Sequence, residues 1–207
     1  MQPKKIFLLL SLCVLLSKSG FSHEVLTSWK LAEQSEDISI SYRLVKIGDT
    51  LKTRQMHISF YVEANPEQMV EMFKNPNKLS AWSPGIKKCE LVQEDSSSWI
   101  TYNLFDIPWP FEKRDLITEY QIVRSDTMMT LFLTGKPNLL PHNPDITRIN
   151  NEGYWIFKPL ENGKVLVEFY TIYLSKPVIP RFIKDPIIQK NFVNSINKLR
   201  ALLTEQA

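Results

Sequence analysis

Few residues in this chain have the types and spacing that catalysis requires. The three histidines, His23, His57 and His142, are far apart, and no group of ligand-type residues has the spacing of a zinc site. There is no Gly-x-Ser-x-Gly nucleophile motif and no glycine-rich phosphate loop. Cys89 follows two lysines that would favour a thiolate, but a half-buried, unreactive thiol is the simpler interpretation. We therefore expect no catalytic residues, no metal and no cofactor.

An apolar segment occurs where polar turn residues would be expected. Residues 107–111 read Ile-Pro-Trp-Pro-Phe, and the two prolines restrict the backbone. Trp109 either packs into the core as part of a rigid turn or stays free to contact membrane headgroups, where tryptophan is favoured.

A second apolar segment, residues 176–182, joins the last predicted strand to the terminal helix. Val178 and Ile179 lie between prolines, with Lys176, Arg181 and Lys184 around them. Apolar residues surrounded by basic ones suit an anionic membrane surface, and such joints often act as hinges. An ordinary solvated loop is the alternative.

Arg114 and Asp115 are adjacent at the head of a predicted strand, so their side chains face opposite sides of the sheet. We expect one of them to be structural. An inward Arg114 would need an acidic partner or a polar ligand group, because an unpaired buried charge is costly. Arg114 therefore either forms an ion pair that stabilises the fold or contacts a ligand head group.

The N-terminus has the pattern of a secretory signal peptide. Lys4 and Lys5 precede an apolar run from Ile6 to Leu16, which is too short to span a bilayer, and small residues follow. We predict a signal peptide over 1–22 with cleavage after Ser22, and export to the periplasm of a Gram-negative bacterium. One domain over 23–207 remains.

Removal of that segment changes the charge and the cysteine count. It takes away three lysines and no acidic residue, so the formal net charge falls from +3 to zero. A domain without surplus positive charge lacks the main source of affinity for nucleic acid, which we exclude as a partner. Removal of residues 1–22 also takes away Cys13. Cys89 is then the only cysteine of the remaining chain, so no internal disulfide can form.

The remaining chain predicts an α+β domain with a large antiparallel sheet. Hydrophobic residues make up 43% of the full sequence, which suffices for a packed core. Asn65, Pro66 and Gln68 predict a helix start, and a further short helix is expected through Trp82. A helix is also predicted over 24–34 and over 186–203, and strands over 38–47, 53–62, 86–93, 99–107, 114–125, 128–134, 146–158 and 164–175.

The run Ile107-Pro108-Trp109-Pro110, followed by Arg114-Asp115, resembles the signature of START domains, the StAR-related lipid-transfer modules. The Asn-Pro helix and the run Ile-Pro-Arg-Phe-Ile before the last helix occur in the order of that family. The resemblance implies a helix-grip fold, in which a curved antiparallel sheet wraps around the long C-terminal helix. It also implies an internal apolar cavity for one lipid, a lid formed by residues 107–111, and no obligatory cofactor.

Strand alternation suggests which residues line such a cavity. The predicted ligand-binding residues are Arg114, Leu116, Thr118, Tyr120, Phe169, Thr171 and Tyr173 on the strands and Phe192 and Ile196 on the terminal helix. The predicted lid and membrane-contact residues are Trp109, Phe111, Val178 and Ile179. An ordinary hydrophobic core is the alternative for the first set. Some family members carry a second arginine at the place of Tyr120, which leaves the head-group chemistry open.

We expect the protein to bind a lipid or sterol-like molecule and to carry it between membranes or to a partner, with transient membrane contact. The alternative is an enzyme of the same fold superfamily, a hydrolase or cyclase acting on an apolar substrate. A third interpretation is a binding module that hands a small molecule to a partner protein.

Overall fold

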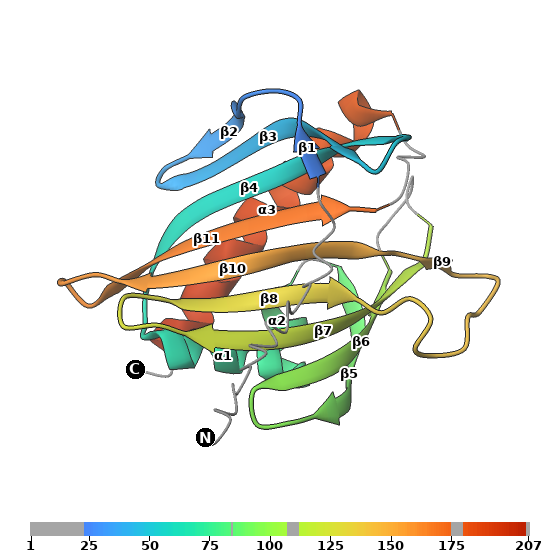
Figure 1. The fold of residues 1–207 in the computed structure, drawn as a ribbon. Coiled ribbons are helices and arrows are strands. Elements are labelled where there is room, and N and C mark those ends of the chain that lie inside the picture. The colour runs from blue at the N-terminus through green and yellow to red at the C-terminus, as the bar shows by residue number, and fades with distance from the viewer. Residues whose placement is uncertain (1–22, 84, 107–111, 175–179, 206–207) are drawn as a thin grey trace, which may run out of the picture.

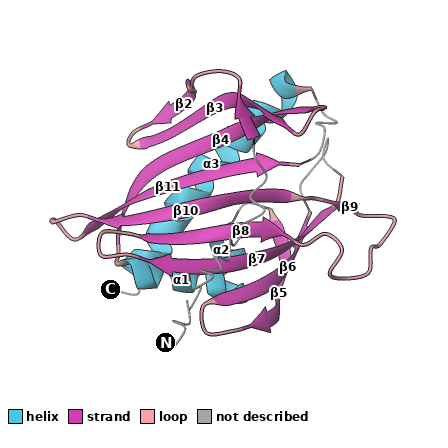
Figure 2. Ribbon diagram, viewed as in Figure 1, coloured by secondary structure: helices cyan, strands magenta, loops and turns pink. Residues whose placement is uncertain are grey.

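The computed structural model describes residues 23–83, 85–106, 112–174 and 180–205. One sheet curves around a long helix, and two short helices lie at the end of the sheet where the long helix finishes (Figures 1 and 2). The strands are β1 (His23–Val25), β2 (Lys30–Ser35), β3 (Ile38–Ile47), β4 (Leu51–Glu63), β5 (Ile86–Glu94), β6 (Ser98–Phe105), β7 (Arg114–Arg124), β8 (Met129–Gly135), β9 (Thr147–Arg148), β10 (Asn151–Pro159) and β11 (Lys164–Tyr173). The helices are α1 (Pro66–Lys74), α2 (Pro76–Trp82) and α3 (Arg181–Thr204). Within these ranges no helix is both long and apolar enough to cross a membrane.

The sheet is open and almost wholly antiparallel. Its strand order is β1-β3-β4-β11-β10-β8-β7-β6-β5, with β2 paired to β3 beside β1, and β9 paired to β7 in parallel. The central pairing of β4 with β11 places the N-terminal hairpin next to the last strand. This is the predicted α+β layout of a curved antiparallel sheet around a long C-terminal helix.

The N-terminal segment differs from the prediction. The helix predicted over 24–34 is wrong, because this segment forms β1 and β2 along the edge of β3. Its apolar spacing fits a helix, but a short helix would rely on its own backbone hydrogen bonds, whereas β3 offers partners that are already in place. The Thr27 side chain adds a hydrogen bond, accepting from the backbone N–H of Leu44 at 2.9 Å.

Local sequence determines where the helices begin. The Asn65 side chain accepts from the backbone N–H of Gln68 at 2.9 Å, and Gln68 accepts from the N–H of Asn65 at 2.8 Å, which confirms the predicted helix start. Helix α3 begins at Arg181, before the predicted start, and contains Pro186. Because Pro186 has no N–H, it cannot donate to the carbonyl of Phe182, and the first turns of α3 lack one helix hydrogen bond.

A buried ion pair fixes the start of β7 on the face of the sheet turned away from α3, here called the outer face. Asp115 is 1% exposed and accepts two hydrogen bonds from Arg148, at 2.9 and 2.7 Å. Arg148 also donates to the carbonyls of Pro137, Leu140 and Pro141. The pair therefore ties the loop after β8 to β7.

The outer face also carries an aromatic cluster that holds the N-terminal segment. The Trp29 ring lies 5.5 Å from the His57 ring, which stacks on Tyr170 at 4.3 Å. The Nε2 atom of His57 lies 3.1 Å from a carboxylate oxygen of Glu168. Burial lowers the pKa of His57; Glu168 opposes this effect and Arg43 adds to it.

Asp115→Ala should lower the free energy of unfolding by about 3 kcal/mol, because it leaves the Arg148 guanidinium buried without a carboxylate. Urea unfolding followed by tryptophan fluorescence measures the change. Glu67→Gln is the matched control, since Glu67 pairs with Arg124 at the surface and should leave the unfolding midpoint unchanged. Equal midpoints for all three proteins would contradict the structural role of Asp115.

Stability should fall as the pH drops below about 6.5, because the unfolded state then binds a proton on His57 that the folded state resists. Thermal unfolding at pH 7.5 and pH 5.5 measures this loss. In His57→Gln, which cannot titrate, the difference between the two pH values should shrink. A variant with the same pH dependence as the unmodified protein would show that His57 is not its source.

Candidate functional site

The face of the sheet that faces α3, here called the inner face, is identified by ring contacts and strand register. The Phe169 ring on β11 lies 6.3 Å from the Phe192 ring on α3. Register partners through β8 and β10 link Tyr120 on β7 with Thr171 on β11, so these two residues share that face. The inner face therefore holds all the strand residues of the predicted ligand-binding set: Arg114, Leu116, Thr118, Tyr120, Phe169, Thr171 and Tyr173.

One end of the inner face is packed by apolar and aromatic side chains. Phe169 stacks on Trp155 at 4.0 Å, and the Phe73 ring of α1 lies 4.9 Å from Trp155. Ile196 and Tyr120, both predicted to line the cavity, belong to the same buried cluster, with 1% and 5% of their surface exposed. This end is a hydrophobic core.

Toward the other end, the inner face becomes polar on β6 and β7. Thr101, Asn103, Thr118 and Tyr120 form a group here called the Asn103 cluster, and all four are buried. Thr101 is the register partner of Thr118, and Asn103 Nδ2 donates to Thr101 Oγ1 at 2.9 Å. Asn103 Oδ1 is buried and has no hydrogen-bond partner among the described residues.

Sequence reasoning missed Thr101 and Asn103. Both lie in the segment that was correctly predicted as a strand over 99–107, and alternation separates them from Tyr102 between them. Alternation does not say which of the two faces is the inner one. The register of β6 against β7 does, because it pairs Trp99 with the inner-face residue Tyr120 and so places Thr101 and Asn103 on the inner face.

The first half of α3 packs loosely on the sheet. No residue of the helix from 181 to 194 is buried, whereas Ser195, Ile196, Leu199 and Leu203 are. Phe192 is only half-buried, and so is Leu116, although β7 has neighbouring strands on both edges. Side chains that face inward and still keep accessible surface indicate space between the inner face and this half of the helix.

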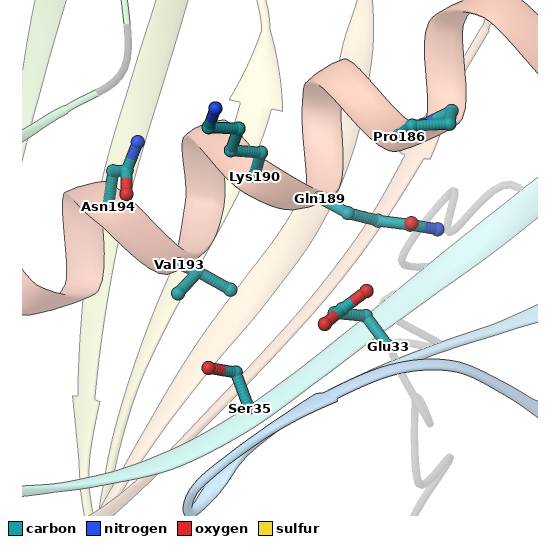
Figure 3. A pocket seen from close by; sticks show the side chains of 7 residues that line it. All are labelled: Glu33, Ser35, Pro186, Gln189, Lys190, Val193 and Asn194. Carbon is teal, nitrogen blue, oxygen red and sulfur yellow. The ribbon is translucent and has the colours of Figure 1, made fainter.

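A groove of about 220 Å³ runs along one side of the same half of α3 (Figure 3). Glu33 and Ser35 of β2 line one wall, and Pro186, Gln189, Lys190, Val193 and Asn194 of α3 line the other. Most of these side chains are polar, and none belongs to the predicted ligand-binding set. The groove shows that α3 stands apart from the edge of the sheet along its first half.

An ion pair connects this loosely packed half of α3 to the sheet. Arg54 on β4 donates to Asp185 at 2.6 Å, with about a fifth of each side chain exposed. The Arg54 guanidinium also lies 4.1 Å from the centre of the Tyr42 ring. Arg200 pairs with Asp37 in the C-terminal half of the helix.

Arg114 and Asp115 divide their roles between the two faces. Asp115 forms the outer ion pair with Arg148, while Arg114 faces inward beside Tyr173 and Lys184. Burial lowers the pKa of Lys184; Asp185 opposes this, and Arg114 is among the neighbouring cations that add to it. Contact between Arg114 and a ligand head group stays a prediction.

The predicted lid residues Trp109, Phe111, Val178 and Ile179 lie outside the described residues. The positions of the described residues that flank these two segments are known. Phe105 and Arg114, which flank the first segment, are register partners on the inner face beyond the Asn103 cluster. Tyr173 and Leu174 precede the second segment, at the end of β11 where the inner face is polar.

The described residues offer little for catalysis. Burial raises the pKa of the Cys89 thiol to about 11, and Glu90 acts in the same direction, so the thiol stays protonated at neutral pH. Within the described ranges, no three His, Cys, Asp or Glu residues gather closely enough to hold a metal ion.

No protein-family model matches this sequence, and no curated protein matches it. Solved structures do match the fold. A fragment of the STAR-related lipid transfer protein from Xanthomonas axonopodis aligns with a TM-score of 0.74 at 22% identity, over 85% of this chain and 98% of that one. Human StAR-related lipid transfer protein 5 aligns with a TM-score of 0.68 at 14% identity, over 86% of each chain. The Zhui aromatase/cyclase from Streptomyces sp. R1128 aligns with a TM-score of 0.54 at 10% identity, over 74% of this chain and 95% of that one.

The chain therefore has the helix-grip fold of START domains, and the predicted fold class is confirmed.

Asp185→Asn should loosen the first half of α3, because it removes the ion pair with Arg54 that connects this half to β4. Hydrogen exchange of peptides covering residues 181–190 should become about fivefold faster, the effect of losing about 1 kcal/mol. Asp37→Asn, which removes the pair with Arg200, is the control and should leave these peptides unchanged. Equal exchange in both variants would rule out the Arg54 pair as the main restraint.

Proposed function

We propose that this protein binds a lipid or sterol-like molecule between the inner face of the sheet and α3, and carries it between membranes or to a partner protein. The observation that carries the proposal is the space under the first half of α3, where Leu116 and Phe192 keep accessible surface. The fold that surrounds it is shared with a STAR-related lipid transfer protein. Enclosing an apolar chain stabilises it by about 0.8 kcal/mol per methylene relative to water, so the molecule can cross an aqueous compartment.

Side chains at the start of α3 support membrane contact. Phe182 is 81% exposed and Ile183 is 39% exposed, which is unusual for large apolar residues next to one another. Arg181 and Lys184 flank them, and this combination suits an anionic bilayer surface. Contact at this point would place the membrane beside the loosely packed half of α3, where a ligand could enter.

Export is part of the same proposal. The signal-type pattern of residues 1–22 supports a location in the periplasm of a Gram-negative bacterium, with residues 23–207 as the lipid-binding domain. In a compartment between two membranes, a protein that encloses an apolar molecule would have both a source and a destination for it.

Two measurements test the proposal. Native mass spectrometry of the protein purified from a bacterial periplasm should reveal a stoichiometric lipid adduct, which extraction identifies. A vesicle assay should then show transfer of that lipid from donor to acceptor membranes. If no adduct forms and no lipid class is transferred, the proposal is overturned. Binding without transfer would favour a module that hands its ligand to a partner.

Phe182→Ser should slow transfer between anionic vesicles about tenfold, because it removes an apolar side chain of the size that anchors proteins in the membrane interface. Leu31→Ser on β2 is the matched control, since Leu31 is 63% exposed on a strand at the edge of the sheet and should not affect transfer. Trp109→Ser, designed from the sequence alone, should slow transfer as well. Unfolding midpoints close to that of the unmodified protein would show that all three variants fold.

An enzyme is the second candidate, because the Streptomyces aromatase/cyclase has a similar fold. A hydrolase or cyclase would convert the apolar molecule inside the same space. Incubation of the loaded protein followed by mass analysis separates the two functions. Release of the ligand unchanged favours the carrier, and a product of different mass favours the enzyme.

A further inference from the structure

We propose that the ligand has a neutral hydroxyl group as its polar end, and that this hydroxyl hydrogen-bonds Asn103 in the Asn103 cluster. The apolar part of the ligand would extend past Leu116 toward Phe192 in the first half of α3. This inference rests on the proposed function, since it assigns a ligand class to the same space.

The central observation is a buried amide that is only partly satisfied. Asn103 is 2% exposed; its Nδ2 donates to Thr101, and its Oδ1 has no partner among the described residues. Buried polar groups in native proteins are nearly always hydrogen-bonded, because leaving one unpaired is unfavourable. A ligand group placed against Asn103 would supply the missing partner.

The Asn103 cluster is electrically neutral. Its members are two threonines, an asparagine and a tyrosine, and burial raises the pKa of Tyr120 so that its phenol stays protonated. The nearby carboxylate of Asp115 faces the outer side and pairs with Arg148. No acidic residue of the cluster could therefore balance a ligand ammonium group.

A hydroxyl fits this surrounding better than a carboxylate. In the amide orientation described, a carboxylate would leave Asn103 Oδ1 unpaired because it only accepts hydrogen bonds, and burying its charge among neutral groups is unfavourable in either orientation. A hydroxyl can donate to an amide oxygen and accept from an amide nitrogen, so it satisfies Asn103 in either orientation of the amide.

The position of the cluster gives the ligand a direction. Along β7, Leu116 and Arg114 lie beyond the cluster on one side, and Ile122 lies on the other. The packed aromatic end with Trp155 and Phe169 belongs to the Ile122 side, because Ile122, Leu131 and Trp155 are successive register partners. That end is closely packed, so an apolar chain whose hydroxyl is held at Asn103 would extend the other way, past Leu116 toward the loosely packed first half of α3.

The test compares four ligands with one dodecyl tail and different ends: dodecanol, dodecanoate, dodecylamine and dodecyl methyl ether. Each displaces the neutral apolar dye N-phenyl-1-naphthylamine from the full mature protein. We expect dodecanol to bind about tenfold more tightly than the ether, the gain of one buried neutral hydrogen bond, and more tightly than the acid or the amine. Equal binding of alcohol and ether, or tighter binding of the acid, would overturn the inference.

Asn103→Leu then assigns the preference to this residue. In this variant dodecanol should lose its tenfold advantage over the ether. Asn151→Leu is the comparison variant, because Asn151 on β10 is another buried inner-face asparagine whose Oδ1 has no partner among the described residues. This variant should keep the preference, and loss of the preference here instead of in Asn103→Leu would overturn the assignment to Asn103. A preference that persists in Asn103→Leu would contradict the assignment, while failure of the dye and all four ligands to bind would count against the proposed function itself. The ligand comparison on the unmodified protein stands even if Asn103→Leu does not fold.

Discussion

A single helix, α3, covers the inner face of a wide, curved sheet, and it packs closely along only one half. In its C-terminal half, Ile196, Leu199 and Leu203 are buried against the core that α1 and α2 complete. In its first half no side chain is fully buried, and the connection to β4 is the ion pair between Arg54 and Asp185. The site described above is a consequence of this uneven packing, because a helix that packed along its whole length would leave no room for a ligand.

The two faces of β7 carry a structural ion pair on one side and the polar groups of the proposed ligand site on the other. On the outer face, Asp115 holds Arg148 and, through it, the carbonyls of the loop after β8. On the inner face, Thr118 and Tyr120 join the Asn103 cluster. The outer ion pair restrains the backbone of β7, and the same backbone carries the polar groups of the inner face.

The α+β class could be predicted from the sequence, because the Asn65 capping box and the strand alternation are local patterns. The arrangement of the sheet around the last helix was implied by the resemblance to START domains. The helix over 24–34 was wrong because pairing with β3, a contact outside the segment, decided its conformation. The inner-face position of Thr118 and Thr171 followed from parity within single strands. Asn103 was not predicted as a site residue, because its assignment depends on the register between two strands and on a buried oxygen without a partner. Neither property can be inferred from a single sequence.

The pairing of β4 with β11 has a consequence for how the chain reaches this structure. His57 and Glu168, which meet across this pair, are 111 residues apart. Contacts between such distant segments form slowly, since a long loop must close before they can contribute. The centre of the sheet is therefore incomplete until β11 is available, and α3 follows still later. A chain that emerges from its N-terminus would therefore lack the central strand pair of its sheet for most of its synthesis.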